Sequence, residues 1–163
     1  MPISPSCKIG KSVIIHHKDL VNLYGCIIGG STQIGPFVEI QKNVVVGEKC
    51  KISSHSFICE GVKIEDEVFI GHGVVFINDL YPSSVTQNGD IQNENDWQLT
   101  KTTVMKGASI GSNSTILGGV IIGKKALIGA GAIISRNVPD FKIVIGNDNR
   151  IIGDTRNLKK DTK

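Results

Sequence analysis

The sequence predicts an all-β protein in which short parallel strands wind into one continuous coil. Three observations support this prediction. The 163 residues include 25 Ile and 15 Val but only 7 Leu, and β-branched residues favour strands over helices. The 19 Gly indicate many tight turns, while aromatic residues make up only 5%. Above all, a large apolar residue recurs at every sixth position, a period that neither a helix nor a hairpin produces.

The longest run of this period lies between residues 28 and 76. Its large apolar positions are Ile28, Ile34, Ile40, Val46, Ile52, Ile58, Ile64, Ile70 and Phe76. Four residues after each of them except Phe76 comes a small or β-branched residue, and glycine often follows the large residue directly. Six is a multiple of the two-residue alternation of a strand, so each hexad is expected to form a short strand and a bend. Three hexads then close one triangular coil, and coils stack through parallel ladders about 4.8 Å apart.

Two other runs share the period but not the phase. A short one, Ile3, Ile9 and Ile15, opens the chain, and a longer one runs from Val104 to Ile134. We therefore expect roughly three coils before the long interruption, two after it, and a partial opening coil. Because a single hexad cannot bury its own apolar face, the stability of this fold must come from stacked neighbours.

The changes of phase between the three runs predict two interruptions of the repeat, and the end of the last run predicts a tail. The interruptions fall near residues 16–27 and at about 77–103. The segment 140–163 is expected to be a short polar tail, and its last ten residues lack the apolar stripe of a helix. The prediction is thus one domain over residues 1–163, with an inserted loop and no second core.

Composition and charge argue against several classes of function. A net charge of +3 is too small to indicate nucleic acid binding, and no apolar run of about 18 residues predicts a membrane span. The N-terminus lacks the basic and apolar regions of a signal peptide, so we expect a cytoplasmic protein. The cysteines have no metal-binding spacing and are expected to be reduced and packed: Cys7, Cys26, Cys50 and Cys59.

The hexad, which covers about residues 3–139, resembles that of the hexapeptide-repeat family. This resemblance implies a left-handed parallel β-helix, and the handedness comes from the resemblance alone, because most parallel crossovers are right-handed. Family members are usually trimers, and most are acyltransferases that use acyl-coenzyme A or an acyl carrier protein. Their sites lie in clefts between neighbouring prisms. The resemblance therefore implies a homotrimeric enzyme.

The long interruption is the first place to look for chemistry. It is polar and contains the only tryptophan, Trp97. Long loops in regular folds usually carry function, so this one could wall off a cleft beside a neighbouring subunit. A simpler alternative is an arm that only locks the trimer together.

The residues around the start of this loop resemble a particular group of hexapeptide enzymes. The turn Asn78-Asp79-x-Tyr81-Pro82 is similar to one in the N-acetyltransferases that modify nucleotide-linked 3-amino-sugars. By this resemblance, Asn78 and Asp79 lie where the acceptor and the thioester meet. The implied reaction is acetyl-coenzyme A-dependent acetylation of the amino group of a dTDP- or UDP-linked sugar for surface glycans.

Tyr81 distinguishes an amine acceptor from a hydroxyl acceptor. The sugar O-acetyltransferases of this family place a catalytic histidine just before the proline, where this chain has Tyr81. A hydroxyl group needs a strong, well-placed base, whereas a neutral amine attacks a thioester unaided. The missing histidine therefore favours N-acetylation over sugar O-acetylation. The third reading, a non-catalytic β-helix scaffold, does not account for the Asn-Asp turn.

Three further residues are candidates for the acceptor site. His72 lies on a bend next to the Asn-Asp turn and could accept a proton near neutral pH. His55 precedes an inward-facing serine, so it points outward and could face a neighbour. Glu60 opens the coil beneath the turn and could orient the amine. For each residue, a plain surface position is the alternative. No metal is expected, because the gaps between His17, His55 and His72 do not fit the three-histidine zinc site of some hexapeptide proteins.

The closing coil, residues 122–139, and the segment 146–150 resemble the part of the family that holds the coenzyme. By this resemblance acetyl-coenzyme A is the acyl donor, and Arg150 pairs with its phosphates. The same resemblance assigns coenzyme contacts to Ser112, Ala130, Ser135 and Arg136. Plain coil packing is the alternative for the small residues, since they suit such bends in any case.

Overall fold

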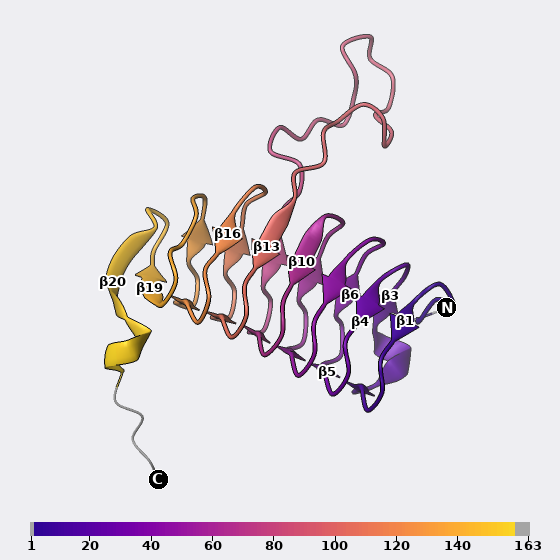
Figure 1. Ribbon diagram of the computed structural model, residues 1–163. Helices are drawn as coiled ribbons and strands as arrows, with labels where there is room; N and C mark the ends of the chain where they lie inside the picture. The colour runs from indigo at the N-terminus through magenta and orange to yellow at the C-terminus, as the bar shows by residue number, and fades with distance from the viewer. Residues whose placement is uncertain (1, 159–163) are drawn as a thin grey trace.

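The computed structural model describes residues 2–158, which form a three-sided prism of stacked coils with one long loop projecting from it (Figure 1). Strands β1–β18 make up successive coils, three strands to a coil, and β19 starts the next one. The first and last coils lie at opposite ends of the prism. This is the parallel β-helix that the hexad predicts.

The strands form three sheets, one on each side of the prism. The first sheet contains β1 (Lys8–Ile9), β4 (Ile27–Ile28), β7 (Val45–Val46), β10 (Val62–Ile64), β13 (Thr102–Val104) and β16 (Ile121–Ile122). The second contains β2 (Ile14–Ile15), β5 (Gln33–Ile34), β8 (Lys51–Ile52), β11 (Phe69–Ile70), β14 (Ser109–Ile110), β17 (Leu127–Ile128), β19 (Lys142–Ile145) and β20 (Arg150–Asp154). The third contains β3 (Asn22–Leu23), β6 (Glu39–Ile40), β9 (Phe57–Ile58), β12 (Val75–Phe76), β15 (Thr115–Ile116) and β18 (Ile133–Ile134).

The core confirms the predicted inward positions. Every large residue of the run from Ile28 to Phe76 is at most 1% exposed, and those from Val104 to Ile134 are fully buried. The residue four positions later is buried as well, except after Phe76, where Leu80 of the long loop is 42% exposed. The opening run differs, because Ile9 is 41% exposed. The first coil has a neighbour on one side only, so its inward residues are not covered from both sides.

The bends follow a rule that the sequence reveals only in part. The left-handed backbone conformation falls three residues after the large apolar residue, and side chains as bulky as Phe37 and His55 adopt it, with φ of 58° and 63°. The glycines directly after the large residue serve another purpose. A Cβ on Gly71 would lie 2.6 Å from the backbone nitrogen of Ser112, so glycine is needed there for the close approach of two coils.

The two interruptions fall where the phase slips predict them. The first contains a 3₁₀ helix, η1 (Lys18–Leu20), and also β3, so the opening coil is complete. The second spans residues 77–101, between the end of β12 and the start of β13. Among the described residues, no helix is long and apolar enough to span a membrane.

The expected polar tail is wrong for much of its length. Strand β19 continues the second sheet beside β17, and β20 folds back antiparallel onto β19. The physical reason is that Val144 stacks on the column of inward residues and is 1% exposed. A second 3₁₀ helix, η2 (Thr155–Asn157), follows, and residues 159–163 lie outside the described part.

Asp154 fixes the end of this closing hairpin. Its carboxylate accepts hydrogen bonds from the Arg156 guanidinium at 2.6 and 2.8 Å and from Lys142 Nζ at 3.1 Å. Arg156 holds the pKa of this carboxyl well below its usual range, so Asp154 stays ionised. The same guanidinium lies 4.8 Å from the ring centroid of Phe141. The hairpin thus covers the last coil with a sheet edge that is held in place by charge.

Candidate active site

The predicted site residues lie along two edges of the prism. At one edge, which we call the His72 corner, the chain passes from the second sheet to the third at residues 35–38, 53–56, 71–74, 111–114 and 129–132. At another, the Asn78 corner, it passes from the third sheet to the first at residues 24–26, 41–44, 59–61, 77–101 and 117–120, and residues 135–137 lead from β18 to Val138, which bridges to Ile122 of the first sheet. The inserted loop belongs to the Asn78 corner.

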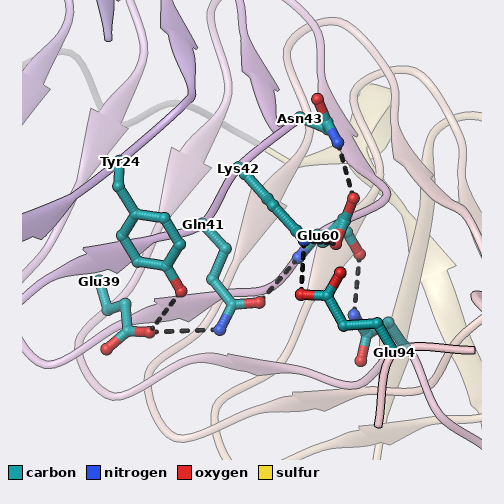
Figure 2. A network of polar contacts seen from close by, with 8 residues as sticks. Tyr24, Glu39, Gln41, Lys42, Asn43, Glu60 and Glu94 are labelled. Carbon is teal, nitrogen blue, oxygen red and sulfur yellow. Dashed lines mark hydrogen bonds and ion pairs between the residues drawn. The ribbon is translucent and has the colours of Figure 1, made fainter. Parts of the chain in front are cut away.

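The Asn78 corner stacks three polar residues in successive coils. Lys42, Glu60 and Asn78 are each 18 residues apart, which is one full coil. Asn78 Nδ2 donates a hydrogen bond to the backbone oxygen of Glu60 at 3.0 Å. The Glu60 carboxylate accepts one from Asn43 Nδ2 at 2.7 Å and lies 3.8 Å from Lys42 Nζ (Figure 2). Glu60 and Asn78, both predicted from the sequence, are therefore in direct contact.

A second layer of polar contacts supports Glu60 from below. Its backbone N–H donates to Gln41 Oε1 at 3.1 Å, and Gln41 Nε2 donates to Glu39 at 3.2 Å. The hydroxyl of Tyr24 donates to the same Glu39 oxygen at 3.4 Å (Figure 2). Burial, and then the neighbouring Glu39 carboxylate, raise the pKa of Tyr24, so this hydroxyl remains a donor at neutral pH.

A pocket of about 570 Å³ lies between this corner and the loop. The prism contributes Tyr24, Gln41, Lys42, Phe57, Glu60 and Asn78 to its lining, and the loop contributes Glu94, Asn95, Trp97 and Leu99. A few polar groups set among aromatic and apolar side chains are typical of a small-molecule site. Its chemistry is clear: Glu60 can pair with a cation, and the Asn78 amide can donate or accept but cannot act as a base.

Asp79 and Tyr81 are placed differently from Asn78. The backbone N–H of Tyr81 donates to Asp79 Oδ1 at 2.9 Å, so the Asp79 carboxylate closes a local turn. The Tyr81 side chain is 89% exposed. Neither residue lines the pocket within one chain. The Asn-Asp-x-Tyr turn thus directs Asn78 inward and Tyr81 outward.

The His72 corner is made of four-residue bends in which most side chains are small, with Phe37, His55 and His72 as the bulky exceptions. His72 Nδ1 lies 2.8 Å from Ser54 Oγ, and the His72 backbone N–H donates to Ser112 Oγ at 3.2 Å. His72 is exposed and lines a shallow pocket of about 240 Å³ together with Ser54. Ala130 follows Ser112 in the next coil and is exposed. At this corner, an imidazole, hydroxyl groups and solvent-exposed backbone are available to a ligand.

His55 points outward, as predicted, and lies at the same corner. Its ring stacks on Phe37 with 4.7 Å between centroids and 31° between planes. Both side chains lie on the outer surface of the prism. Within one chain, His55 is therefore on a different edge from Glu60 and Asn78.

The predicted coenzyme residues divide between the two corners. Ser112 and Ala130 belong to the His72 corner, whereas Ser135 and Arg136 belong to the Asn78 corner. Arg136 Nη2 donates to the backbone oxygen of Asp148 at 2.9 Å, and Ser135 contacts Asn149 Oδ1 at 3.1 Å.

Arg150 follows the same turn of the closing hairpin. Its backbone N–H donates to Asp148 Oδ1 at 3.2 Å, and the residue is exposed. The turn that carries Asp148 therefore links Arg150 to Arg136 at the Asn78 corner. Across residues 2–158, no three His, Cys, Asp or Glu side chains are grouped as metal ligands.

Sequence reasoning missed Lys42, Glu94 and the aromatic residues Tyr24 and Phe57. The 18-residue coil period could have found Lys42, because it places this residue directly beneath Glu60. No such signal exists for Glu94, since the loop has no period. The contact of the loop with the prism follows only from the three-dimensional structure.

Stacked parallel hexads with an inserted loop define the class of this protein, a repeat β-helix. The model of the family described as "Bacterial transferase hexapeptide (six repeats)" matches residues 25–60 and 101–136. The chain thus carries the hexapeptide repeat of that family in two stretches, and its fold is a left-handed parallel β-helix.

The curated relatives are longer proteins. The bifunctional protein GlmU of Thermotoga petrophila is 30% identical over 160 residues, which cover 94% of this chain but 34% of GlmU. The chain thus spans between about a quarter and a third of the length of the curated relatives that it matches.

Two solved structures share the fold across most of the chain. A variant of AntD, an N-acyltransferase from Bacillus cereus in complex with dTDP and coenzyme A, is 19% identical, with a TM-score of 0.70 over 90% of this chain and 83% of AntD. A variant of GDP-perosamine N-acetyltransferase from Caulobacter crescentus, in complex with coenzyme A and GDP-perosamine, is also 19% identical. Its TM-score is 0.62 over 93% of this chain and 56% of that enzyme. At these identities the likeness is one of fold.

Proposed function

We propose that the protein is an acyltransferase that moves the acetyl group of acetyl-coenzyme A to the amino group of a nucleotide-linked 3-amino-sugar. The observation that carries this proposal is the Asn78 corner. It places the Glu60 carboxylate and the Asn78 amide in one pocket beneath Trp97. Among the described residues that line this pocket there is no histidine. The family and the names of the two similar enzymes support acyl transfer to an amine.

The chemistry of the pocket suits an amine better than a hydroxyl. A protonated amine pairs with the Glu60 carboxylate and then loses a proton to water or to His72. Its lone pair attacks the thioester carbon, the C–N bond forms, and the C–S bond breaks. The coenzyme A thiolate leaves and takes up the second amine proton. Asn78 holds the amine or the thioester carbonyl in line for this attack.

The complete site requires two copies of the chain, and we propose a homotrimer. The acceptor residues Glu60 and Asn78 lie at one corner, whereas His72, Ser112 and Ala130 lie at another. A coenzyme between two prisms would contact both corners, one from each copy. The first sheet also exposes aliphatic side chains to the outside: Ile27 at 43%, Val45 at 37% and Ile121 at 46%. Sedimentation equilibrium should give about three times the mass of one chain, and a stable, active monomer would contradict the proposal.

The product would serve surface glycan assembly in the cytoplasm, with a dTDP- or UDP-linked sugar as acceptor. A panel of nucleotide-linked sugars with acetyl-coenzyme A tests this, with release of free thiol as the readout. We expect the 3-amino-sugar to be acetylated and its 3-hydroxy counterpart to be a poor acceptor. Equal use of the 3-hydroxy sugar would contradict N-acetylation and indicate sugar O-acetylation instead.

A further inference from the structure

The inserted loop is attached to the prism by very few polar contacts. Its residues 79–99 make several hydrogen bonds among themselves, including a small hairpin in which Val85 pairs with Ile91. In the described part of the chain, one hydrogen bond joins these residues to the prism, and it runs from Lys42 Nζ to Glu94 Oε1. Side chains of this segment also line the pocket, and Leu99 lies beside Gly61 of the prism.

Lys42 sits between the loop and the acceptor residue. Its Nζ lies 2.7 Å from Glu94 Oε1 and 3.8 Å from Glu60 Oε2 (Figure 2). The hydrogen bond to Glu94 is the main cause that raises the pKa of Lys42, so the ammonium group stays charged. The side chain of Glu60 is 21% exposed and that of Glu94 is 79% exposed. One cation thus contacts both a fixed carboxylate in the pocket and a carboxylate on the loop.

We propose that the Lys42–Glu94 ion pair holds the inserted loop closed over the acceptor pocket, and that Lys42 also positions the Glu60 carboxylate for the acceptor amine. Lys42 is a positioning residue, because it acts through Glu60 and through the loop. The second half of this inference rests on the proposed function, and the first half does not.

The strength of the pair fits such a role. Solvent-exposed ion pairs shift an equilibrium by at most about fivefold, so the closed loop is favoured but can still open. An acceptor can therefore enter and then be covered by Trp97 and Leu99. High salt screens exposed charges and should favour the open loop.

Trp97 makes loop closure measurable without any substrate. It is the only tryptophan in the chain, it lies three residues after Glu94, and it lines the pocket. We expect Lys42→Met and Glu94→Gln to shift its emission to longer wavelength and to raise quenching by acrylamide about twofold, within the range set by one exposed pair. Acrylamide is neutral, so the altered charges do not affect its local concentration.

Lys106→Met is the matched control, because it removes another solvent-exposed ion pair, with Glu67 at 3.1 Å, on another edge of the prism. It should leave the emission and the quenching unchanged, and Lys42→Arg should retain most of the wild-type values. Unchanged quenching in both Lys42→Met and Glu94→Gln would overturn the closure half of the inference.

Kinetics separate the two roles of Lys42. In Lys42→Met and Glu94→Gln, the KM for the acceptor should rise about two- to fivefold while the KM for acetyl-coenzyme A stays the same. The doubly reversed variant, Lys42→Glu with Glu94→Lys, should restore the emission of Trp97, because the pair forms again. Its acceptor KM should stay high, because a carboxylate then faces Glu60. Full recovery of this KM would overturn the positioning role, whereas failure of every sugar in the panel would count against the proposed function alone.

Discussion

The His72 corner and the Asn78 corner are built from the same hexad, yet they differ in nearly every chemical respect. At the His72 corner, four-residue bends carry serine, alanine and glycine, and coils approach so closely that a Cβ at Gly71 would meet the next backbone. At the Asn78 corner, charged residues stack in successive coils, and a long loop encloses a pocket of about 570 Å³. The difference indicates that the two corners suit different ligands. The His72 corner presents backbone to an extended ligand, and the Asn78 corner encloses a compact one.

Under the proposed function, this division also requires a second copy of the chain to complete the site. An edge of a rigid prism cannot fold over to meet another edge of the same prism. Residues at two corners can meet only when a second copy docks beside the first. The predictions below separate the acceptor role of the Asn78 corner from the donor role of the His72 corner.

The largest effect is expected from Asn78→Ala. Loss of one preorganised hydrogen-bonding group at the reacting atoms should lower kcat by about 10²–10³. The shape of the pH profile should survive, because an amide does not titrate. Steady-state kinetics measure both quantities, and thermal unfolding controls for the lost hydrogen bond to Glu60, which contributes about 1 kcal/mol. A wild-type kcat would remove Asn78 from the reaction.

A change at the His72 corner should alter the pH dependence. If His72 accepts the amine proton, His72→Asn should lower kcat/KM by about 10² at neutral pH and abolish the acidic limb of its profile. His17→Asn is the control, since His17 is an exposed histidine in the opening coil and does not line the pocket that His72 lines. Survival of the acidic limb would show that the acceptor amine governs the profile by itself.

A smaller effect should follow from Arg150→Ala. If the Arg150 guanidinium pairs with the coenzyme phosphates, its loss should raise the KM for acetyl-coenzyme A about ten- to hundredfold. The KM for the sugar should hardly change. Lys18→Ala removes a distant exposed cation and should have no effect. A normal coenzyme KM in Arg150→Ala would place this residue outside the coenzyme site.

The prism could be predicted from the sequence because each hexad repeats the same local rule. The inward positions, both interruptions and the parallel stacking all follow from one period. The closing hairpin was missed because Val144 extends the core after the strict spacing has ended. In that segment, the burial of a residue depends on its position relative to the last coil more than on the polarity of the surrounding sequence.

The candidate site could be predicted only in part. Glu60 and Asn78 meet because they are one coil apart, which the sequence contains. Asp79 and Tyr81 belong to the same motif, but the geometry of the turn ties one of them to the backbone and exposes the other. Glu94 and Trp97 lie in a segment without a period, so their approach to the prism depends on contacts such as the one with Lys42.

Subunit complementation tests most directly whether the two corners form one site between copies. Asn78→Ala disables the acceptor corner, and Ala130→Trp places a bulky ring at the exposed edge where the coenzyme is expected. Each variant alone should be nearly inactive, with unchanged mass in sedimentation. Co-expressed at equal levels, they should regain about a quarter of the wild-type activity. Under random mixing, that share of interfaces combines the intact Asn78 corner of one variant with the intact His72 corner of the other. Mixed oligomers without activity would contradict a shared site, as would an Ala130→Trp enzyme with normal activity.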